Sequence, residues 1–268
     1  MNSMNIEELY QVFLRHPSIC TDSRQVEQGD FFVALPGERV DGNTFAEAAL
    51  ELGAAVALVS DPALAERDER CIYTEDTLLA LQQLAKRHRE SFRIPLLAIT
   101  GSNGKTTTKE LCAVVLTQRY KVLYTEGNFN NHLGMPLTLL RLTDEHEIAV
   151  VEIGINHPGE MSPLADIARP THALITGIGK AHLEGFGSLE GTLREKSILA
   201  ERAYERGGVV FLNLDDPLLR ERWSDKAQVT YGLADGSYER EPDFRVTILR
   251  EQPYLSLRIS CSLGEQEV

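Results

Sequence analysis

From Ile94 onward the sequence alternates short apolar stretches with segments of helical spacing, and this alternation limits the fold more than any other feature. The apolar stretches, such as "PLLAIT" and "EIAVVEIG", are continuous, which is typical of strands buried on both faces. Strand–helix repeats of this kind predict a largely parallel sheet covered by helices. The helices are expected at 105–119, 134–142, 159–168, 188–205 and 215–223.

The two ends of the chain depart from this pattern. The N-terminal part combines short apolar stretches with helical spacing at 43–53 and 76–90, which predicts a small α/β unit. Pro95 disfavours helix just before it, so we expect domains at 1–92 and 93–268. The last segment alternates polar and apolar residues like antiparallel strands and stops without a closing element. We therefore expect a second domain that is incomplete, as in a fragment of a longer protein.

The composition excludes several classes of protein. With 43% hydrophobic and 25% charged residues the chain is typical of a globular protein, and no run approaches the ~20 apolar residues of a membrane span. The formal net charge of −13 opposes non-specific binding to nucleic acid or acidic membranes. Four separated cysteines without a C-x-x-C pair indicate neither a disulfide framework nor a zinc site. We expect a cytoplasmic protein that binds no nucleic acid and inserts into no membrane.

A glycine-rich loop follows the first strand of the predicted sheet. Its glycines let backbone N–H groups turn toward a phosphate, Lys105 supplies positive charge, and Thr106 can ligate Mg²⁺ at the helix start. The usual loop G-x-x-x-x-G-K-[ST] would need glycine where Ile99 stands. A capped strand–helix turn is the alternative, but it would not need the Gly-Lys-Thr run. We predict a phosphate loop of shortened spacing formed by Gly101, Ser102, Asn103, Gly104, Lys105, Thr106 and Thr107.

Polar residues also follow later strands, and the carboxyl ends of parallel strands gather at one edge of a sheet. Asn128 either approaches a phosphate or belongs to an ordinary Asn/Gly turn. Glu152 ends an apolar strand and either holds Mg²⁺ or forms a buried ion pair. Taken singly, His182 in a glycine-rich loop would pass for a structural histidine, and Lys196 on the next helix for a surface lysine.

Together these motifs resemble the Mur ligase family, the ATP-dependent amide-forming ligases of peptidoglycan synthesis. The resemblance extends over essentially the whole chain and is strongest to the MurF branch, whose members join D-alanyl-D-alanine to UDP-N-acetylmuramoyl-tripeptide. It implies that a third, C-terminal domain is missing and that these 268 residues alone are inactive. The matching stretches are "TDSRQVEQGDFFVALPGERVDGN", "TGSNGKTTTKE", "EGNFNNHLGMPLTLL", "EIGINHPGEM" and "HLEGFGSLEGTLREKSI".

The resemblance also implies roles for the candidate residues. Lys105 would bind the ATP phosphates, and Thr106 would ligate the first of two Mg²⁺ ions. Glu152 and His182 would ligate the second Mg²⁺, with Lys196 beside them as a carbamylated, anionic lysine. Because only a neutral amine adds CO₂, Lys196 would need a lowered pKa or a transient deprotonation.

Further expectations follow from the same resemblance. Asn128 would lie near the γ-phosphate of ATP, and Ser23, Arg39 and Asp41 near the uridine end of the substrate. A substrate carboxylate would attack the γ-phosphate to give an acyl phosphate, and an incoming amine would then displace phosphate. Mg²⁺ and the loop amides would offset the repulsion between the two anions. We expect the protein to be a monomer.

Three alternatives stay open. The nearest is another ligase of the superfamily: a MurE-type enzyme, folylpolyglutamate synthase or a cyanophycin-synthetase-like enzyme. "GSNGKTTTKE" with "GNFNNHLGMPLTLL" favours the MurF branch over a MurE-type enzyme, and the UDP-type N-terminal domain argues against folylpolyglutamate synthase. A regulatory nucleotide-binding protein would need base-reading motifs such as N-K-x-D, which the sequence lacks. A non-catalytic module would bind the UDP substrate and ignore ATP.

Overall fold

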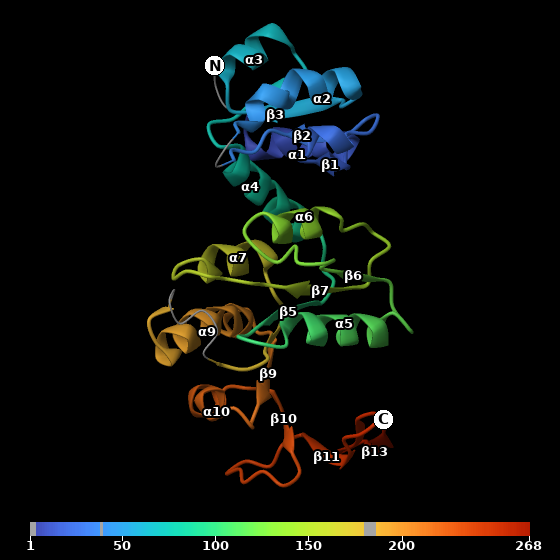
Figure 1. Ribbon diagram of the computed structural model, residues 1–268, viewed down its shortest axis with the longest axis vertical. Coiled ribbons are helices and arrows are strands. Elements are labelled where there is room, and N and C mark those ends of the chain that lie inside the picture. Colours follow the sequence, from blue (N-terminus) through green and yellow to red (C-terminus); the bar gives the residue numbers. More distant parts are fainter. Residues whose placement is uncertain (1–3, 38–39, 180–185) are drawn as a thin grey trace. The chain divides into compact units, whose positions relative to one another are not determined.

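The computed structural model describes residues 4–37, 40–179 and 186–268 (Figure 1). The chain forms two compact units, and we call them the first and the second unit. The first unit comprises residues 1–93 and 132–144, and the second comprises 94–131 and 145–268. The chain therefore crosses between the units three times, because a short helical segment within the later sequence packs with the first unit.

The first unit contains a four-stranded parallel sheet of order β1-β2-β3-β4. Its strands are β1 (Ile19–Cys20), β2 (Phe31–Val33), β3 (Val56–Val59) and β4 (Cys71–Tyr73). Its helices are α1 (Ile6–Arg15), α2 (Ala46–Leu52), α3 (Pro62–Arg67), α4 (Thr77–Glu90) and α6 (Gly134–Leu140), with 3-10 turns η1 (Ser23–Gln25) and η2 (Gly42–Phe45). The middle strand β2 is buried along its whole length, as expected for a strand covered on both faces.

The N-terminal helix α1 shows how the local sequence sets these elements. Asn5 accepts a hydrogen bond from the backbone N–H of Glu8 at 3.0 Å, and the Glu8 carboxylate accepts from the Asn5 N–H at 3.3 Å. This reciprocal capping box satisfies two donors that a helix start otherwise leaves unpaired. Tyr10 and Phe13 lie on the buried face of α1, which packs on α4.

The second unit contains a nine-stranded sheet of order β13-β12-β11-β10-β9-β8-β5-β7-β6. All pairs from β11 to β6 are parallel, whereas β11, β12 and β13 pair antiparallel. The strands are β5 (Leu96–Thr100), β6 (Val122–Tyr124), β7 (Ile148–Glu152), β8 (His172–Ile175), β9 (Val209–Asn213), β10 (Val229–Leu233), β11 (Phe244–Arg250), β12 (Ser256–Cys261) and β13 (Gly264–Glu267). The predicted α/β fold, with a mostly parallel sheet that ends in antiparallel strands, is confirmed.

The helices of the second unit cover its sheet from two sides. They are α5 (Lys105–Leu116), α7 (Met161–Ala168), α9 (Leu189–Glu205) and α10 (Pro217–Trp223). The crossover from β5 to β6 and the crossover from β7 to β8 run in opposite directions along the sheet. Since such crossovers are right-handed, α5 and α7 lie on opposite faces (Figure 1). Ligands of open parallel sheets bind beyond the strand ends where this direction reverses, here at β5 and β7.

Several elements differ from the sequence-based expectation. The segment 43–53 contains η2 followed by α2 rather than one helix, because Asp41 accepts a hydrogen bond from the Asn43 N–H at 3.0 Å and starts a tight turn. Helix α3 and strand β4 were not predicted, because segments this short show no clear hydrophobic period. None of the helices in the described residues has the length and apolar composition needed to cross a membrane.

Candidate functional site

The predicted phosphate loop joins β5 to α5, and neighbouring backbone holds it in place. The Ser102 N–H donates to the Gly177 carbonyl at 2.9 Å, and the Gly179 N–H donates to Ser102 Oγ at 2.9 Å. Thr176 Oγ1 lies 2.6 Å from the Asn103 carbonyl oxygen. The segment that follows β8 therefore fastens the loop at three points, so the loop shape does not depend on its own residues alone.

At the end of the loop, backbone N–H groups and the positive charge of Lys105 are available to bind an anion. Gly104 has φ +78°, a left-handed conformation that favours glycine, and it directly precedes α5. Lys105 Nζ donates back to the Gly101 carbonyl at 3.0 Å, which holds the ammonium over the loop. Burial lowers the pKa of Lys105, and the negative charge of Glu152 opposes that shift. A helix start with a lysine beside it is suited to binding phosphate.

The carboxylate of Glu152 is completely buried at the end of β7, and its two oxygens have different surroundings. Oε1 accepts from Asn130 Nδ2 at 2.7 Å and from Thr106 Oγ1 at 3.2 Å. Oε2 is buried without a hydrogen-bond partner among the described residues. Within the described part of the chain the hydrogen-bond partners of this carboxylate are thus an amide and a hydroxyl rather than the Lys or Arg of a buried ion pair.

The carboxylate of Glu152 and the hydroxyl of Thr106 are suitable ligands for a hard divalent cation. Mg²⁺ prefers carboxylate and hydroxyl oxygens, and an ion at the orphaned Oε2 would satisfy an otherwise unfavourable buried atom. No cluster of three His, Cys, Asp or Glu side chains suited to a metal occurs among the described residues. His182, the other predicted ligand, lies outside the described residues. Glu152 and Thr106 therefore fit one Mg²⁺ that a nucleotide would help to hold.

Lys196 lies on α9 and is not a surface lysine, since its side chain is 1% exposed. Burial, and secondarily the charge of Lys105, lower the pKa of Lys196 to about 8, while Glu195 acts in the opposite direction. Nζ lies 5.9 Å from the centre of the Phe186 ring. Glu195 in turn accepts from the Gly159 N–H at 2.8 Å and ties α9 to the start of α7. A buried lysine with a lowered pKa can present a neutral amine near physiological pH.

Asn130 is a contact of Glu152 that the sequence analysis missed. Asn128, which the sequence analysis places near the γ-phosphate of ATP, has an exposed side chain, and its carbonyl oxygen accepts from the Asn130 N–H at 2.7 Å. Any asparagine of the "NFNN" run could have faced the site. No pattern in the sequence singles out Asn130, because its packing against Gly154, where a Cβ would lie 3.0 Å from the Asn130 side chain, is set by the tertiary structure.

Two of the residues predicted for the uridine end, Ser23 and Asp41, lie in the first unit, near the carboxyl ends of β1 and β2. Ser23 lines a cavity of about 470 Å³ together with the turn around Gly42. Asp41 does not line it but accepts from Asn43 N and Nδ2, which shapes that turn. Arg39 lies outside the described residues. Ser23 and the turn therefore face one cavity that can hold part of a small molecule.

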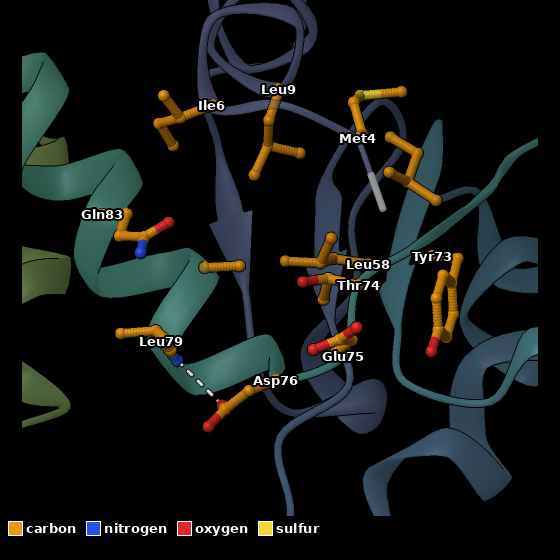
Figure 2. Close-up of a pocket in the computed structure, with 12 residues that line it drawn as sticks. Met4, Ile6, Leu9, Leu58, Tyr73, Thr74, Glu75, Asp76, Leu79 and Gln83 are labelled. Carbon is orange, nitrogen blue, oxygen red and sulfur yellow. Dashed lines mark hydrogen bonds between the residues drawn. The ribbon is translucent and has the colours of Figure 1, made fainter. Parts of the chain in front are cut away.

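A second cavity of the first unit, of about 260 Å³, lies between α1, the ends of β3 and β4, and the start of α4 (Figure 2). Its walls include Ile6, Leu9 and Leu58, and its charged residues are Glu75 and Asp76. Asp76 is already occupied as the cap of α4, because it accepts from the Leu79 N–H at 2.9 Å. A cavity whose charged lining residues are both acidic does not suit a nucleotide phosphate, and no predicted site residue lines it.

Comparison with known proteins covers both units. The family described as "Mur ligase middle domain" matches residues 99–253, and that described as "Mur ligase family, catalytic domain" matches residues 17–89. The UDP-N-acetylmuramoyl-tripeptide--D-alanyl-D-alanine ligase of Bacillus subtilis (strain 168) is 40% identical over 240 residues, which are 85% of this chain and 51% of that ligase. The ligase of the same name from Escherichia coli (strain K12) is 42% identical over 199 residues, 74% of this chain and 43% of its own length.

Solved structures agree with these sequence matches. MurF from Acinetobacter baumannii has a TM-score of 0.84 and 32% identity, and the match covers 100% of this chain and 60% of that one. MurF ligase from Thermotoga maritima in complex with ADP has a TM-score of 0.83 and 28% identity, covering 95% of this chain and 58% of that one. The chain spans about half the length of the curated relatives that it matches.

Proposed function

Because the chain belongs to the Mur ligase family, we propose that it provides the substrate-binding and ATP-binding parts of a ligase. The ligase joins D-alanyl-D-alanine to UDP-N-acetylmuramoyl-tripeptide at the expense of ATP. The observation that carries this proposal is the 40% identity, over 240 residues, to a curated ligase of that name. A MurE-type ligase is disfavoured, because the diaminopimelate ligase among the structural neighbours has a TM-score of only 0.55.

In this proposal the loop from Gly101 to Thr107 binds the ATP phosphates. The backbone N–H groups at the start of α5 and the ammonium of Lys105 offset phosphate charge. Asn128, exposed at the turn after β6, is available to approach the γ-phosphate. The substrate carboxylate attacks the γ-phosphorus, the bond to ADP breaks, and an acyl phosphate results. The amine of D-alanyl-D-alanine then attacks the acyl carbon and phosphate leaves.

The family resemblance assigns Thr106 to a first Mg²⁺ and Glu152, with His182, to a second. Because Thr106 Oγ1 and Glu152 Oε1 lie 3.2 Å apart, we propose instead that both hold Mg²⁺ beside the phosphates and that His182 contributes to the second site. Mg²⁺ supplies charge neutralisation when two anions are brought together. The buried, partnerless Oε2 of Glu152 supports this role. The Thr106 hydroxyl supports it too, because a hydroxyl that donates its proton to Glu152 keeps lone pairs for a cation.

We further propose that Lys196 carries a carbamate. Its neutral amine would attack CO₂, a nitrogen–carbon bond would form, and the released proton would go to solvent. The lowered pKa of Lys196, about 8 through burial, supports a substantial neutral fraction at physiological pH. Carbon-13 NMR of the protein in labelled bicarbonate tests this, because a carbamate signal present in the wild type must disappear in Lys196→Met.

The first unit would receive the UDP end of the substrate. The cavity beside Ser23 supports this role, and Asp41 shapes the turn around Gly42 that lines it. We propose that Arg39, which lies outside the described residues, also contacts the uridine end. We expect the protein to act as a monomer in the cytoplasm. Light scattering on the purified chain tests the oligomeric state, and a dimer mass would contradict the expectation.

Titration calorimetry tests the proposed function directly. The chain should bind UDP-N-acetylmuramoyl-tripeptide, and in a separate titration it should bind a non-hydrolysable ATP analogue with Mg²⁺. Lys105→Ala should weaken binding of the ATP analogue and leave binding of the UDP compound unchanged, because Lys105 lies on the glycine-rich loop of the second unit. Binding of the ATP analogue alone would point to a regulatory nucleotide-binding protein. Binding of the UDP compound alone would point to a non-catalytic module.

A further inference from the structure

The carboxylate of Glu152 has an orientation that its own strand does not determine. Its plane can turn about the last side-chain bond, and such terminal torsions are broad. Two hydrogen bonds nevertheless converge on Oε1, from Asn130 at 2.7 Å and from Thr106 at 3.2 Å, and none reaches Oε2 from the described residues. The shorter bond comes from Asn130. The side chain that decides which oxygen stays free is therefore the amide of Asn130.

Asn130 is itself held from three directions. Its N–H donates to the Asn128 carbonyl at 2.7 Å, and its carbonyl accepts from the Gly154 N–H at 2.8 Å. Its side chain packs against Gly154, where a Cβ would lie 3.0 Å from Cγ and Oδ1. Gly154 does not have a left-handed conformation, so glycine is not needed there for its backbone. Its missing side chain instead leaves room for the Asn130 amide. Backbone bonds and close packing thus leave the amide little freedom.

The chemistry of the amide explains why this position suits asparagine. An ionised carboxylate only accepts hydrogen bonds, so the NH₂ group and not the carbonyl oxygen must face Glu152. The NH₂ group is neutral and has no lone pair to offer a metal, so it orients the carboxylate without competing for the cation. An aspartate here would put two carboxylates at hydrogen-bond distance and favour a shared proton.

We propose that Asn130 is a positioning residue that holds Oε1 of Glu152 and thereby keeps Oε2 directed at a divalent cation. The inference rests on the proposed function, since it assumes the Mg²⁺ of a nucleotide complex. Partners that orient a metal ligand typically contribute about 10- to 100-fold in metal affinity. We expect an effect of that size from the Asn130 amide.

The test is a titration with Mn²⁺, followed by electron paramagnetic resonance, of the chain saturated with a non-hydrolysable ATP analogue. Asn130→Ala should weaken Mn²⁺ binding about 10- to 100-fold. Gly154→Ala should weaken it less, because a new methyl group displaces the amide by only a few tenths of an ångström. This second variant leaves Asn130 in place and keeps the test valid if Asn130→Ala does not fold.

Thr125→Val is the matched control. Thr125 is fully buried and its Oγ1 accepts from the backbone N–H of Glu152 at 3.0 Å, so this change disturbs the same strand end without touching the carboxylate. It should lower the unfolding temperature and leave Mn²⁺ affinity unchanged. A merely structural role for Asn130 would make its variant behave like Thr125→Val.

Glu152→Gln separates this inference from the proposed function. If the wild type binds no Mn²⁺ in the nucleotide complex, or if Glu152→Gln binds it equally well, the proposed metal site itself is wrong. If Glu152→Gln weakens binding but Asn130→Ala and Gly154→Ala do not, only the role of Asn130 is overturned. It is also overturned if Asn130→Ala weakens binding as much in the Glu152→Gln background as in the wild type, because Asn130 would then not act through Glu152.

Discussion

Replacing Gly101 by alanine should destabilise the second unit through one identifiable collision. Gly101 has φ +146°, and a Cβ built there would lie 1.9 Å from Thr176 Oγ1 and 3.1 Å from the Thr176 nitrogen. The hydroxyl of Thr176 must therefore rotate away. Its oxygen lies 2.6 Å from the Asn103 carbonyl oxygen and 3.3 Å from that of Thr100, so the rotation removes one of the three bonds that fasten the glycine-rich loop.

The magnitude follows from two contributions. A side chain in the left-handed region costs about 1 kcal/mol, and the lost hydrogen bond about 1 kcal/mol more. The sum is about 2 kcal/mol for Gly101→Ala. Gly104→Ala is the matched control, because Gly104 also has positive φ, +78°, but apart from its chain neighbours no atom of the described residues lies within 4 Å of its Cβ position. Only the backbone contribution of about 1 kcal/mol applies there.

Urea unfolding followed by the fluorescence of Trp223 measures these free energies. Trp223 is the single tryptophan of the chain, is 2% exposed and lies on α10, so it reports on the second unit. In the Gly101→Ala/Thr176→Ala double variant the close contact with Oγ1 is gone. The two changes together should then cost about 1 kcal/mol less than the sum of the single changes. Simple additivity, or equal destabilisation by Gly101→Ala and Gly104→Ala, would refute the collision.

Three further predictions concern titratable side chains. In CO₂-free buffer the free energy of unfolding of the wild type should rise by about 3 kcal/mol relative to that of Lys196→Met as pH rises from about 8 to 10.5. The reason is that the unfolded state binds the Lys196 proton more tightly in that range. A constant difference between the two proteins would contradict the lowered pKa. Burial lowers the pKa of His88, whose Nε2 donates to the Leu142 carbonyl at 2.9 Å. As the pH falls below 6.5, the pKa of this histidine in the unfolded state, the wild type should therefore lose folding stability, whereas His88→Gln should keep it. Unfolding followed by circular dichroism at decreasing pH measures this loss. An equal loss of stability in the wild type and in His88→Gln would contradict the prediction. Glu195→Gln should cost about 1 kcal/mol, since a neutral oxygen accepts more weakly from the Gly159 and Met161 N–H groups, and it should lower the pKa of Lys196 further; an unchanged Lys196 titration would contradict this.

The parts of the site that come from adjacent residues were predictable. The glycine-rich loop from Gly101 to Thr107 is contiguous, and the phosphate binding that we propose for it depends only on the spacing of its glycines, lysine and threonine along the chain. The parallel sheet was predictable because buried strands and amphipathic helices have distinct apolar periods. The contact between Thr106, Asn130 and Glu152 was not, because these residues are far apart in sequence and meet only through strand order.

The burial of Lys196 was another feature that no local pattern revealed. Its neighbours Glu195 and Ser197 are polar, so the local sequence is typical of a solvent-exposed helix face. In the structure all three are buried, and α9 packs on β8, β9 and α7. The Glu195 carboxylate is satisfied by two backbone N–H groups at the start of α7, which no pattern within α9 could indicate.

By itself the sequence determined the fold class, the glycine-rich turn between β5 and α5, and the family, because each depends on residue types in a fixed order along the chain. Tertiary structure alone decided which asparagine meets Glu152, which of its oxygens stays without a partner, and that Lys196 is buried. The physical reason is that β5 lies between β7 and β8, so the ends of three strands distant in sequence converge. Burial there removes water, and the remaining partners of each polar atom are set by packing across that edge.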